Sequence, residues 1–103
     1  KSDLDMMTAL SKQPVSVAIE ADQKDFQLYS SGVFTGKCGT NLDHGVLVVG
    51  YGTDSSNNDY YTIKNSWGTS WGMNGYINIG RGDEYNNGQG QCGVLLQASY
   101  PSI

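Results

Sequence analysis

The spacing of apolar residues at the N-terminus is that of a short helix. Ser2 or Asp3 can cap its first turn, where acidic side chains suit the positive end of a helix. The periodic pattern stops at about Ser11, just before a Gln-Pro pair. Three apolar residues recur at three-residue intervals and are predicted to share one stripe of this helix: Leu4, Met7 and Leu10.

The following segments alternate between strand patterns and polar turns. "PVSVAIEA" has apolar residues at every second position and predicts a half-buried strand, with Val15, Val17 and Ile19 on its inner face. "DQKDFQLYSSG" predicts a turn or short helix that brings Phe26 and Tyr29 onto the core. "GVLVVG" is apolar throughout, which is typical of a central strand with two buried faces.

Two further strands are predicted after the polar loop "TDSSNND". The first, "YYTIKN", would place Tyr61, Ile63 and Asn65 on one side, and "YINIGR" follows as the second. "GDEYNNGQGQ" predicts a flexible loop and "CGVLLQASYP" a last strand. The pattern predicts a mainly β domain over residues 1–103, with four or five antiparallel strands in a small barrel or sheet and one N-terminal helix.

Composition and charge exclude several classes of function. The formal net charge is −4, and the six basic residues are scattered singly, so no footprint for nucleic acid or an anionic membrane is present. No apolar run approaches the roughly 18 residues of a membrane span. The 14 glycines favour strands and tight turns over long helices.

The two cysteines, Cys38 and Cys92, lie far apart and outside any C-x-x-C pair. The simplest interpretation is one disulfide, which would place the chain in an oxidising compartment. Two free buried thiols are the alternative. A metal site of His44, Cys38 and Asp43 is a third interpretation, but with one histidine a zinc site needs help from carboxylates, and a disulfide would remove the thiol.

The single histidine, His44, follows a polar stretch and opens the apolar strand, so its ring is expected at the rim. Asn65 ends the next strong strand. Antiparallel pairing would bring the start of one strand beside the end of the other, and the Asn65 amide oxygen could then accept from one imidazole nitrogen. This is the base and orienter half of a catalytic triad, and Trp67 could cover the bond. A satisfied core histidine, a turn asparagine and a packing tryptophan are the structural alternatives.

Three segments carry a family resemblance. "LDHGVLVVGYG", "IKNSWGTSWGMNGY" and "CGVLLQASYP" resemble the C-terminal half of papain-like cysteine peptidases of the cathepsin L type. The similarity extends to "QPVSVAIEA" and "DFQLYSSGVFTGKCG", so it spans essentially the whole chain. It implies the β-rich, right-hand domain of a two-domain fold that is α+β by parentage. Tyr61 is a departure, since the family usually carries tryptophan there.

The resemblance implies a role for each matching residue. His44 would be the general base and acid, Asn65 its orienter, and Trp67 a shield for their bond and part of the primed-side wall. Cys38 and Cys92 match a family disulfide. No metal or cofactor is implied.

Substrate-binding positions follow from the same resemblance. The S2 pocket would be lined by Ala18, Leu42, Gly45 and Gln97, with Gln97 at its floor. The backbone carbonyl of Asp43 would accept from the substrate amide next to the scissile bond. Such a pocket is expected to prefer leucine, phenylalanine or valine at P2.

The nucleophile is missing from this pattern. The papain-like signature C-G-[SA]-C-[WY] does not occur, and neither "KCGT" nor "QCGV" resembles it. The expected partner is therefore an N-terminal peptidase domain that carries the catalytic cysteine on another chain or segment. Together they would form a lysosomal, vacuolar or secreted thiol endopeptidase that acts on peptides or proteins and binds cystatin-type or propeptide inhibitors. The alternative is an isolated fragment or binding module, inactive alone.

Overall fold

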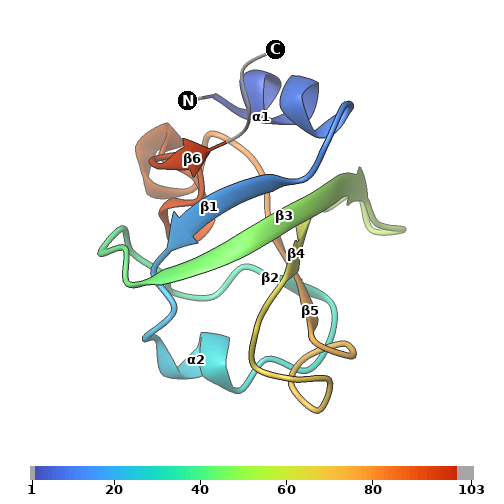
Figure 1. The fold of residues 1–103 in the computed structure, drawn as a ribbon, viewed down its shortest axis with the longest axis vertical. Coiled ribbons are helices and arrows are strands. Elements are labelled where there is room, and N and C mark those ends of the chain that lie inside the picture. Colours follow the sequence, from blue (N-terminus) through green and yellow to red (C-terminus); the bar gives the residue numbers. More distant parts are fainter. Residues whose placement is uncertain (1, 100–103) are drawn as a thin grey trace.

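The computed structural model describes residues 2–99 of the chain (Figure 1). Its elements in chain order are α1 (Asp3–Leu10), β1 (Val15–Ile19), α2 (Lys24–Gln27), β2 (Val33–Phe34), β3 (His44–Thr53), β4 (Asp59–Lys64), β5 (Tyr76–Gly80), the 3-10 turns η1 (Asn86–Gly88) and η2 (Gln91–Gly93), and β6 (Ala98–Ser99). No helix within this range is both long and apolar enough to cross a membrane.

One sheet organises the described part of the chain, and its six strands lie in the order β2-β5-β4-β3-β1-β6. Figure 1 shows β1 and β3 crossing the middle of the molecule side by side. The prediction of a small, mainly β domain with an N-terminal helix is confirmed. The sheet is open, and one pairing is not antiparallel, because the two-residue strand β2 runs parallel to β5.

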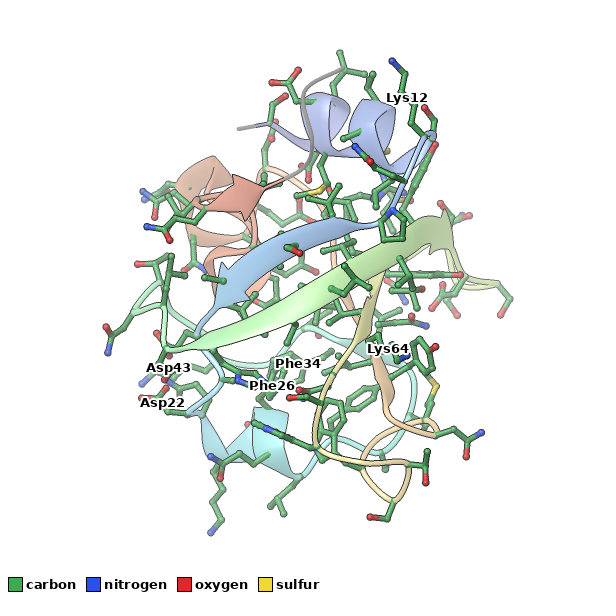
Figure 2. The ribbon with its side chains drawn as sticks, in the orientation of Figure 1. Lys12, Asp22, Phe26, Phe34, Asp43 and Lys64 are labelled. Carbon is green, nitrogen blue, oxygen red and sulfur yellow. A yellow bond between two sulfur atoms is a disulfide. The ribbon has the colours of Figure 1, made fainter. Side chains whose placement is uncertain are left out.

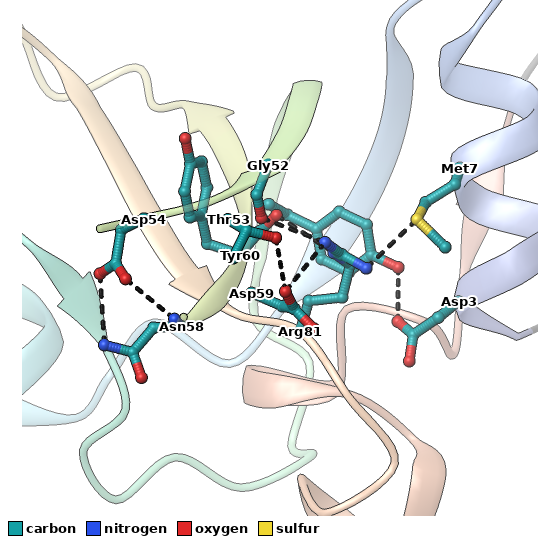
Figure 3. Close-up of polar contacts among 10 residues, drawn as sticks. Asp3, Met7, Gly52, Thr53, Asp54, Asn58, Asp59, Tyr60 and Arg81 are labelled. Atoms are coloured by element: carbon teal, nitrogen blue, oxygen red, sulfur yellow. Dashed lines mark hydrogen bonds and ion pairs between the residues drawn. The ribbon is translucent and has the colours of Figure 1, made fainter. Parts of the chain in front are cut away.

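The strands β3 and β4 form a hairpin with a bulge. Thr53 pairs with Asp59 at the turn, and Leu47 pairs with Lys64 near the other end. The register shifts by one residue between Val48 and Gly50, so the two halves of the hairpin are out of phase. At the turn, the Asp54 carboxylate accepts hydrogen bonds from the backbone and side-chain nitrogens of Asn58, which closes the loop without help from the rest of the sheet (Figure 3).

The core lies on one face of this sheet, and its main predictions are confirmed. The alternating residues of β1 are buried, and Phe26 of α2 and the following Tyr29 pack onto the core. The rings of Phe26 and Phe34 meet edge to face with centroids 5.8 Å apart (Figure 2). Side chains with no exposed surface include Val15, Ile19, Phe26, Val48, Tyr61, Ile63, Ile77 and Ile79.

The prediction that β3 is buried on both faces is wrong. Val46 and Val48 face the core, but Leu47 is only half-buried and Val49 is 36% exposed. Although β3 is central in the strand order, the described residues cover only one of its faces. The apolar run therefore leaves an exposed strip on the opposite side.

The helix α1 forms where it was predicted, but its buried stripe is different. Met6 and Ala9 are buried, whereas Leu4 is 71% exposed. Met7 and Leu10 pack only at the edge of the core. An eight-residue helix has two candidate stripes one position apart, and its contacts with the sheet decide between them.

Hydrogen bonds at the start of α1 fix this rotation. The Ser2 hydroxyl accepts from the Asp5 amide at 3.1 Å, which confirms the predicted cap. The buried Tyr61 hydroxyl donates to Asp3 at 2.5 Å and so ties the helix to β4. Burial, with the Asp3 carboxylate next, raises the pKa of the Tyr61 hydroxyl, so it stays a donor.

The mostly buried guanidinium of Arg81 joins the same end of the sheet to α1 (Figure 3). It donates to the carbonyl oxygens of Tyr60 and Gly52 at 3.3 and 3.1 Å. A third nitrogen lies 3.3 Å from the Met7 sulfur, and Asp59 completes the set as an ion pair at 3.6 Å. These contacts join the ends of β3 and β4 to the helix.

The C-terminal predictions are partly wrong. In place of a loop followed by a strand, the chain forms η1 and η2, and only Ala98–Ser99 pairs as a strand. Cys92 and Gly93 have φ values of +58° and +72°, which turn the chain where extended backbone was expected. Tyr100 and Pro101, the end of the predicted strand, lie outside the described residues.

Cys38 and Cys92 form a disulfide with Cα atoms 4.8 Å apart, and both residues are buried. The free-thiol alternative is therefore wrong. The bridge joins the segment before β3 to the turn η2, 54 residues later. It encloses β3, β4 and β5 within one covalent loop.

Replacing both cysteines with alanine should lower the free energy of unfolding by about 2–5 kcal/mol, because the unfolded chain regains the freedom that the bridge removes. Chemical denaturation of parent and variant would measure this difference. Reductant serves as the matched control, since it should bring the parent to the variant's stability and leave the variant unchanged. Equal stability of parent and variant without reductant would contradict the prediction.

Candidate functional site

The predicted pair of His44 and Asn65 is brought together by the β3–β4 hairpin. His44 is the first residue of β3, and Asn65 follows the last residue of β4. The two strands are antiparallel, so the start of one lies beside the end of the other. His44 Nε2 and Asn65 Oδ1 are 2.7 Å apart, which is a direct hydrogen bond.

The orientation of the Asn65 amide fixes the direction of this bond. Asn65 Oδ1 also accepts from the Ser66 backbone N–H at 2.7 Å, so the oxygen must face both groups. His44 Nε2 is then the donor, and the neutral ring carries its hydrogen there. Nδ1 keeps a lone pair and has no hydrogen-bond partner among residues 2–99. The site thus presents an imidazole whose Nδ1 is free and whose ring is held in place through Nε2.

Burial of Asn65 makes this arrangement costly. Asn65 is 6% exposed, and its Nδ2 is buried without a hydrogen-bond partner in the described part of the chain. A buried amide that leaves one donor unpaired bears a desolvation cost. The hydrogen bonds through Oδ1 are therefore made at the expense of the other end of the same side chain.

Trp67 covers the pair. Its ring stacks on His44 with centroids 5.1 Å apart and planes inclined by 28°, while 37% of the residue stays exposed. Phe26 and Trp71 support it from behind, at centroid distances of 5.7 and 5.2 Å. Trp71 is itself anchored, since its indole N–H donates to the Gln27 carbonyl oxygen at 3.0 Å. The sequence predicted core packing for Phe26 but not this support of Trp67, although the four-residue spacing of the tryptophans was a signal.

The residues predicted to line a pocket lie around β1. Ala18 pairs with Gly45 in the sheet, and the Ala18 N–H donates to the Gln97 carbonyl oxygen at 3.2 Å. These three residues are therefore neighbours. Leu42 is half-buried and lies against Gly93, where an added Cβ would stand 2.9 Å from its side chain. Asp43 immediately precedes His44 and is exposed.

An open groove of about 450 Å³ runs beside Asn65 on the outer face of the sheet. The sequence did not predict this groove, because the apolar run of β3 led us to expect that both of its faces are buried. The groove is lined by apolar and small polar residues and one cationic side chain, and its lining includes Ser16, Gly45, Leu47, Lys64, Asn65 and Ser66.

The metal-site alternative is not supported. Cys38 is consumed by the disulfide, so it offers no thiolate ligand. Within residues 2–99 no group of three histidine, cysteine or acidic side chains is placed to hold a metal ion. The same residues contain no free cysteine. The geometry thus offers an imidazole that is hydrogen-bonded to an amide oxygen through Nε2.

Comparison with known proteins gives a consistent result. The family model described as "Papain family cysteine protease" matches residues 1–102. "Cysteine protease 1" from Oryza sativa subsp. japonica is 55% identical over 100 residues, 96% of this chain and 20% of that protein. "Vignain" from Ricinus communis is 55% identical over 96 residues, 93% of this chain and 26% of that protein. The chain thus spans about a fifth to a quarter of these relatives.

Solved structures agree in fold. The bromelain protease from Ananas comosus, in complex with the E64 inhibitor, superposes with a TM-score of 0.91 at 45% identity. The match covers 99% of this chain and 46% of that one. The Amb a 11 cysteine protease, a ragweed pollen allergen solved in its proform, gives a TM-score of 0.88 at 43% identity, over 93% of this chain and 28% of that one.

The hydrogen bond between His44 and Asn65 predicts one tautomer. In nitrogen-15 NMR spectra at a pH where the ring is neutral, Nε2 should appear protonated and Nδ1 unprotonated. Asn65→Ala removes the acceptor, so the preference for Nε2–H should weaken and this hydrogen should exchange faster with solvent. Asn78→Ala, which alters a side chain hydrogen-bonded to Thr62 in the same sheet, is the matched control. A parent protein with its hydrogen on Nδ1 would contradict the prediction.

Proposed function

Because the chain belongs to the papain family of cysteine proteases, we propose that it supplies the base and the orienter of a thiol endopeptidase. His44 would serve a cysteine on an N-terminal peptidase domain, carried by another segment or chain. The observation that carries the proposal is the His44–Asn65 hydrogen bond, which leaves Nδ1 free on the open side of the ring.

The chemistry follows from these two nitrogens. Nδ1 of His44 takes the proton of the cysteine thiol, which leaves a thiolate and an imidazolium. The thiolate attacks the peptide carbonyl, and the imidazolium then gives its proton to the leaving amine. In the second half, the neutral ring takes a proton from water as the water attacks the thioester, and returns that proton to the cysteine sulfur. Asn65 Oδ1 accepts the Nε2 hydrogen throughout and holds the ring in place.

Trp67 would contribute by limiting water. Its ring stacks on His44, so the hydrogen bond to Asn65 is screened from competing solvent. Packing against Phe26 and Trp71 keeps that ring in place. An exposed edge remains, which suits a wall of the primed side.

The substrate side of the proposal rests on the neighbours of β1. Ala18, Leu42 and Gly45 would form an apolar S2 slot with Gln97 at its floor, and the Asp43 carbonyl would bind the substrate amide. The absence of large side chains at Ala18 and Gly45 leaves room for a branched or aromatic P2 residue.

The family of partners and the compartment are also proposals. The motif "KNSWGTSWGMNGY" supports a cathepsin L type of peptidase, and the E64 complex and the proform among similar structures support binding of inhibitors and a propeptide at this site. Cystatin-type inhibitors would use the same surface. The disulfide supports an oxidising compartment, which agrees with a lysosomal, vacuolar or secreted location.

The role of His44 can be tested on the native preparation and on variants. An intact mass spectrum with an epoxide inhibitor of thiol proteases should show one inhibitor equivalent on the cysteine of the partner segment. In the active protein, His44→Ala should lower kcat/KM by about 10⁴-fold or more, and Asn65→Ala by a smaller factor, on the order of 10²-fold. The control variant Asn78→Ala should have a kcat/KM near that of the parent.

A preparation that contains this chain alone and takes up no inhibitor would favour the second interpretation, a non-catalytic fragment or binding module. Retention of full activity in His44→Ala would remove the proposed base altogether.

The P2 preference is a separate prediction. In a library of peptide substrates varied at P2, leucine, phenylalanine and valine should give higher kcat/KM than arginine, because a neutral Gln97 cannot neutralise a buried cation. Gln97→Glu should raise the rate with arginine relative to leucine. A parent enzyme that cleaves the arginine substrate faster than the leucine substrate would contradict this pocket.

A further inference from the structure

The buried carboxylate of Glu20 holds the segment that leads from the disulfide to His44. Glu20 follows β1 directly and is 5% exposed. Its Oε1 accepts from the Asn41 backbone N–H at 2.9 Å, and its Oε2 accepts from the Gly39 N–H at 3.2 Å and from the Gln23 side-chain nitrogen at 2.5 Å. We refer to residues 39–43 as the His44 loop.

The far end of the His44 loop returns a second carboxylate to the same stretch of backbone. Asp43 Oδ1 accepts from the Ala21 N–H at 2.9 Å, and the Asp43 N–H donates to the Ile19 carbonyl oxygen at 2.9 Å. Figure 2 shows Asp43 and Asp22 close together, where β3 begins. Residues 19–21 therefore bind both ends of the His44 loop. The Glu20 side chain holds the first end, and the Asp43 side chain attaches the second end to the Ala21 backbone.

Steric contacts leave the His44 loop little freedom. A Cβ on Gly39 would stand 2.6 Å from Glu20 Oε1, so the backbone approaches the carboxylate more closely than another residue allows. On the opposite side, a Cβ on Gly93 would stand 2.9 Å from the Leu42 side chain and 3.3 Å from the Thr40 Cα. The loop thus lies between the Glu20 carboxylate and the backbone next to Cys92.

From these contacts we propose that Glu20 is a positioning residue for substrate: it holds the His44 loop so that Leu42 and Asp43 meet the P2 side of a bound peptide. This inference rests on the proposed peptidase function. Within residues 2–99, the hydrogen bonds of the Glu20 side chain reach neither His44 nor the proposed substrate positions. It acts through the two backbone N–H groups that it binds.

Charge makes the carboxylate suited to this task. The hydrogen bond from Gln23, followed by those from the Asn41 and Gly39 backbone, outweighs burial and lowers the pKa of Glu20 below its usual value. The charged groups that face it are two other carboxylates, Asp22 on its own segment and Asp43 on the loop. Desolvation, then the charges of Asp43 and Glu20, raises the pKa of Asp22. The Glu20 contribution is thus present above the usual glutamate pKa and is lost only as the pH falls through its lowered value.

The test compares Glu20→Gln with Glu84→Gln in the full protein that contains this chain. The amide keeps the shape of the carboxylate but replaces one acceptor oxygen with a donor, so one backbone N–H loses its partner. Glu84 is an exposed carboxylate, and the same change there controls for the loss of charge. Gly39→Ala is a second variant, which displaces the loop without altering any charge.

Two measurements are expected to change. Hydrogen exchange at the Gly39 and Asn41 amides should accelerate by about 10-fold or more in Glu20→Gln, while amides of β3 and β4 keep their protection, which also shows that the fold is intact. In peptide hydrolysis, KM should rise about 10-fold with kcat nearly unchanged, and the preference for leucine over alanine at P2 should shrink. The catalytic cysteine of the full protein should be alkylated by iodoacetamide at the rate of the parent. The reaction of this small reagent depends on the thiolate and imidazolium alone.

Several outcomes would overturn the assignment. Unprotected Gly39 and Asn41 amides in the parent would show that the contacts do not hold the loop. Kinetics of Glu20→Gln that match those of Glu84→Gln, or a fall in kcat at constant KM, would rule out a role in substrate placement. A parent protein without peptidase activity would instead refute the proposed function and, with it, the role in substrate placement, while the exchange data would still decide whether Glu20 holds the loop.

Discussion

The antiparallel pairing of β3 with β4 is the constraint on which the site depends. His44 and Asn65 are 21 residues apart in the chain, and only this pairing brings their side chains to 2.7 Å. The hydrogen bond then selects which imidazole nitrogen is free. The disulfide, the aromatic rings and the buried Glu20 carboxylate all act on this hairpin from outside. They fix either the segment that precedes β3 or the Trp67 ring that covers His44.

Each support comes from a different part of the chain, yet all meet on the same core. Phe26 of α2 packs beneath Trp67, and Cys92 of η2 bonds to Cys38 just before the His44 loop. The core therefore has two tasks, since it stabilises the sheet and also transmits the position of α2 and η2 to the site. Phe26, for example, fills the core and also supports Trp67.

Much of this arrangement could be predicted from the sequence. Alternating apolar residues identified β1 and β4, and the positions of His44 and Asn65 at strand ends indicated their contact. The rotation of α1 could not be predicted, because it depends on where Tyr61 and Arg81 meet the helix. The turn at Cys92 was missed since a positive φ at a non-glycine residue leaves no signature in the sequence. The role of Glu20 could not be predicted, because two of its hydrogen-bond donors are the backbone N–H groups of Gly39 and Asn41, which leave no pattern in the sequence.

The hairpin turn at residues 54–58 lies at the opposite end of β3 and β4 from the site. Asp54 closes it locally with Asn58, and the bulge after Val48 separates its register from the pairs nearest to His44 and Asn65, Leu47 with Lys64 and Val48 with Ile63. Chain length can therefore vary in this turn while the register at the other end stays the same. For evolution, the turn is a place where surface can be rebuilt without altering the His44–Asn65 pair. For an experimenter, it is a natural point at which to insert a label or an affinity tag.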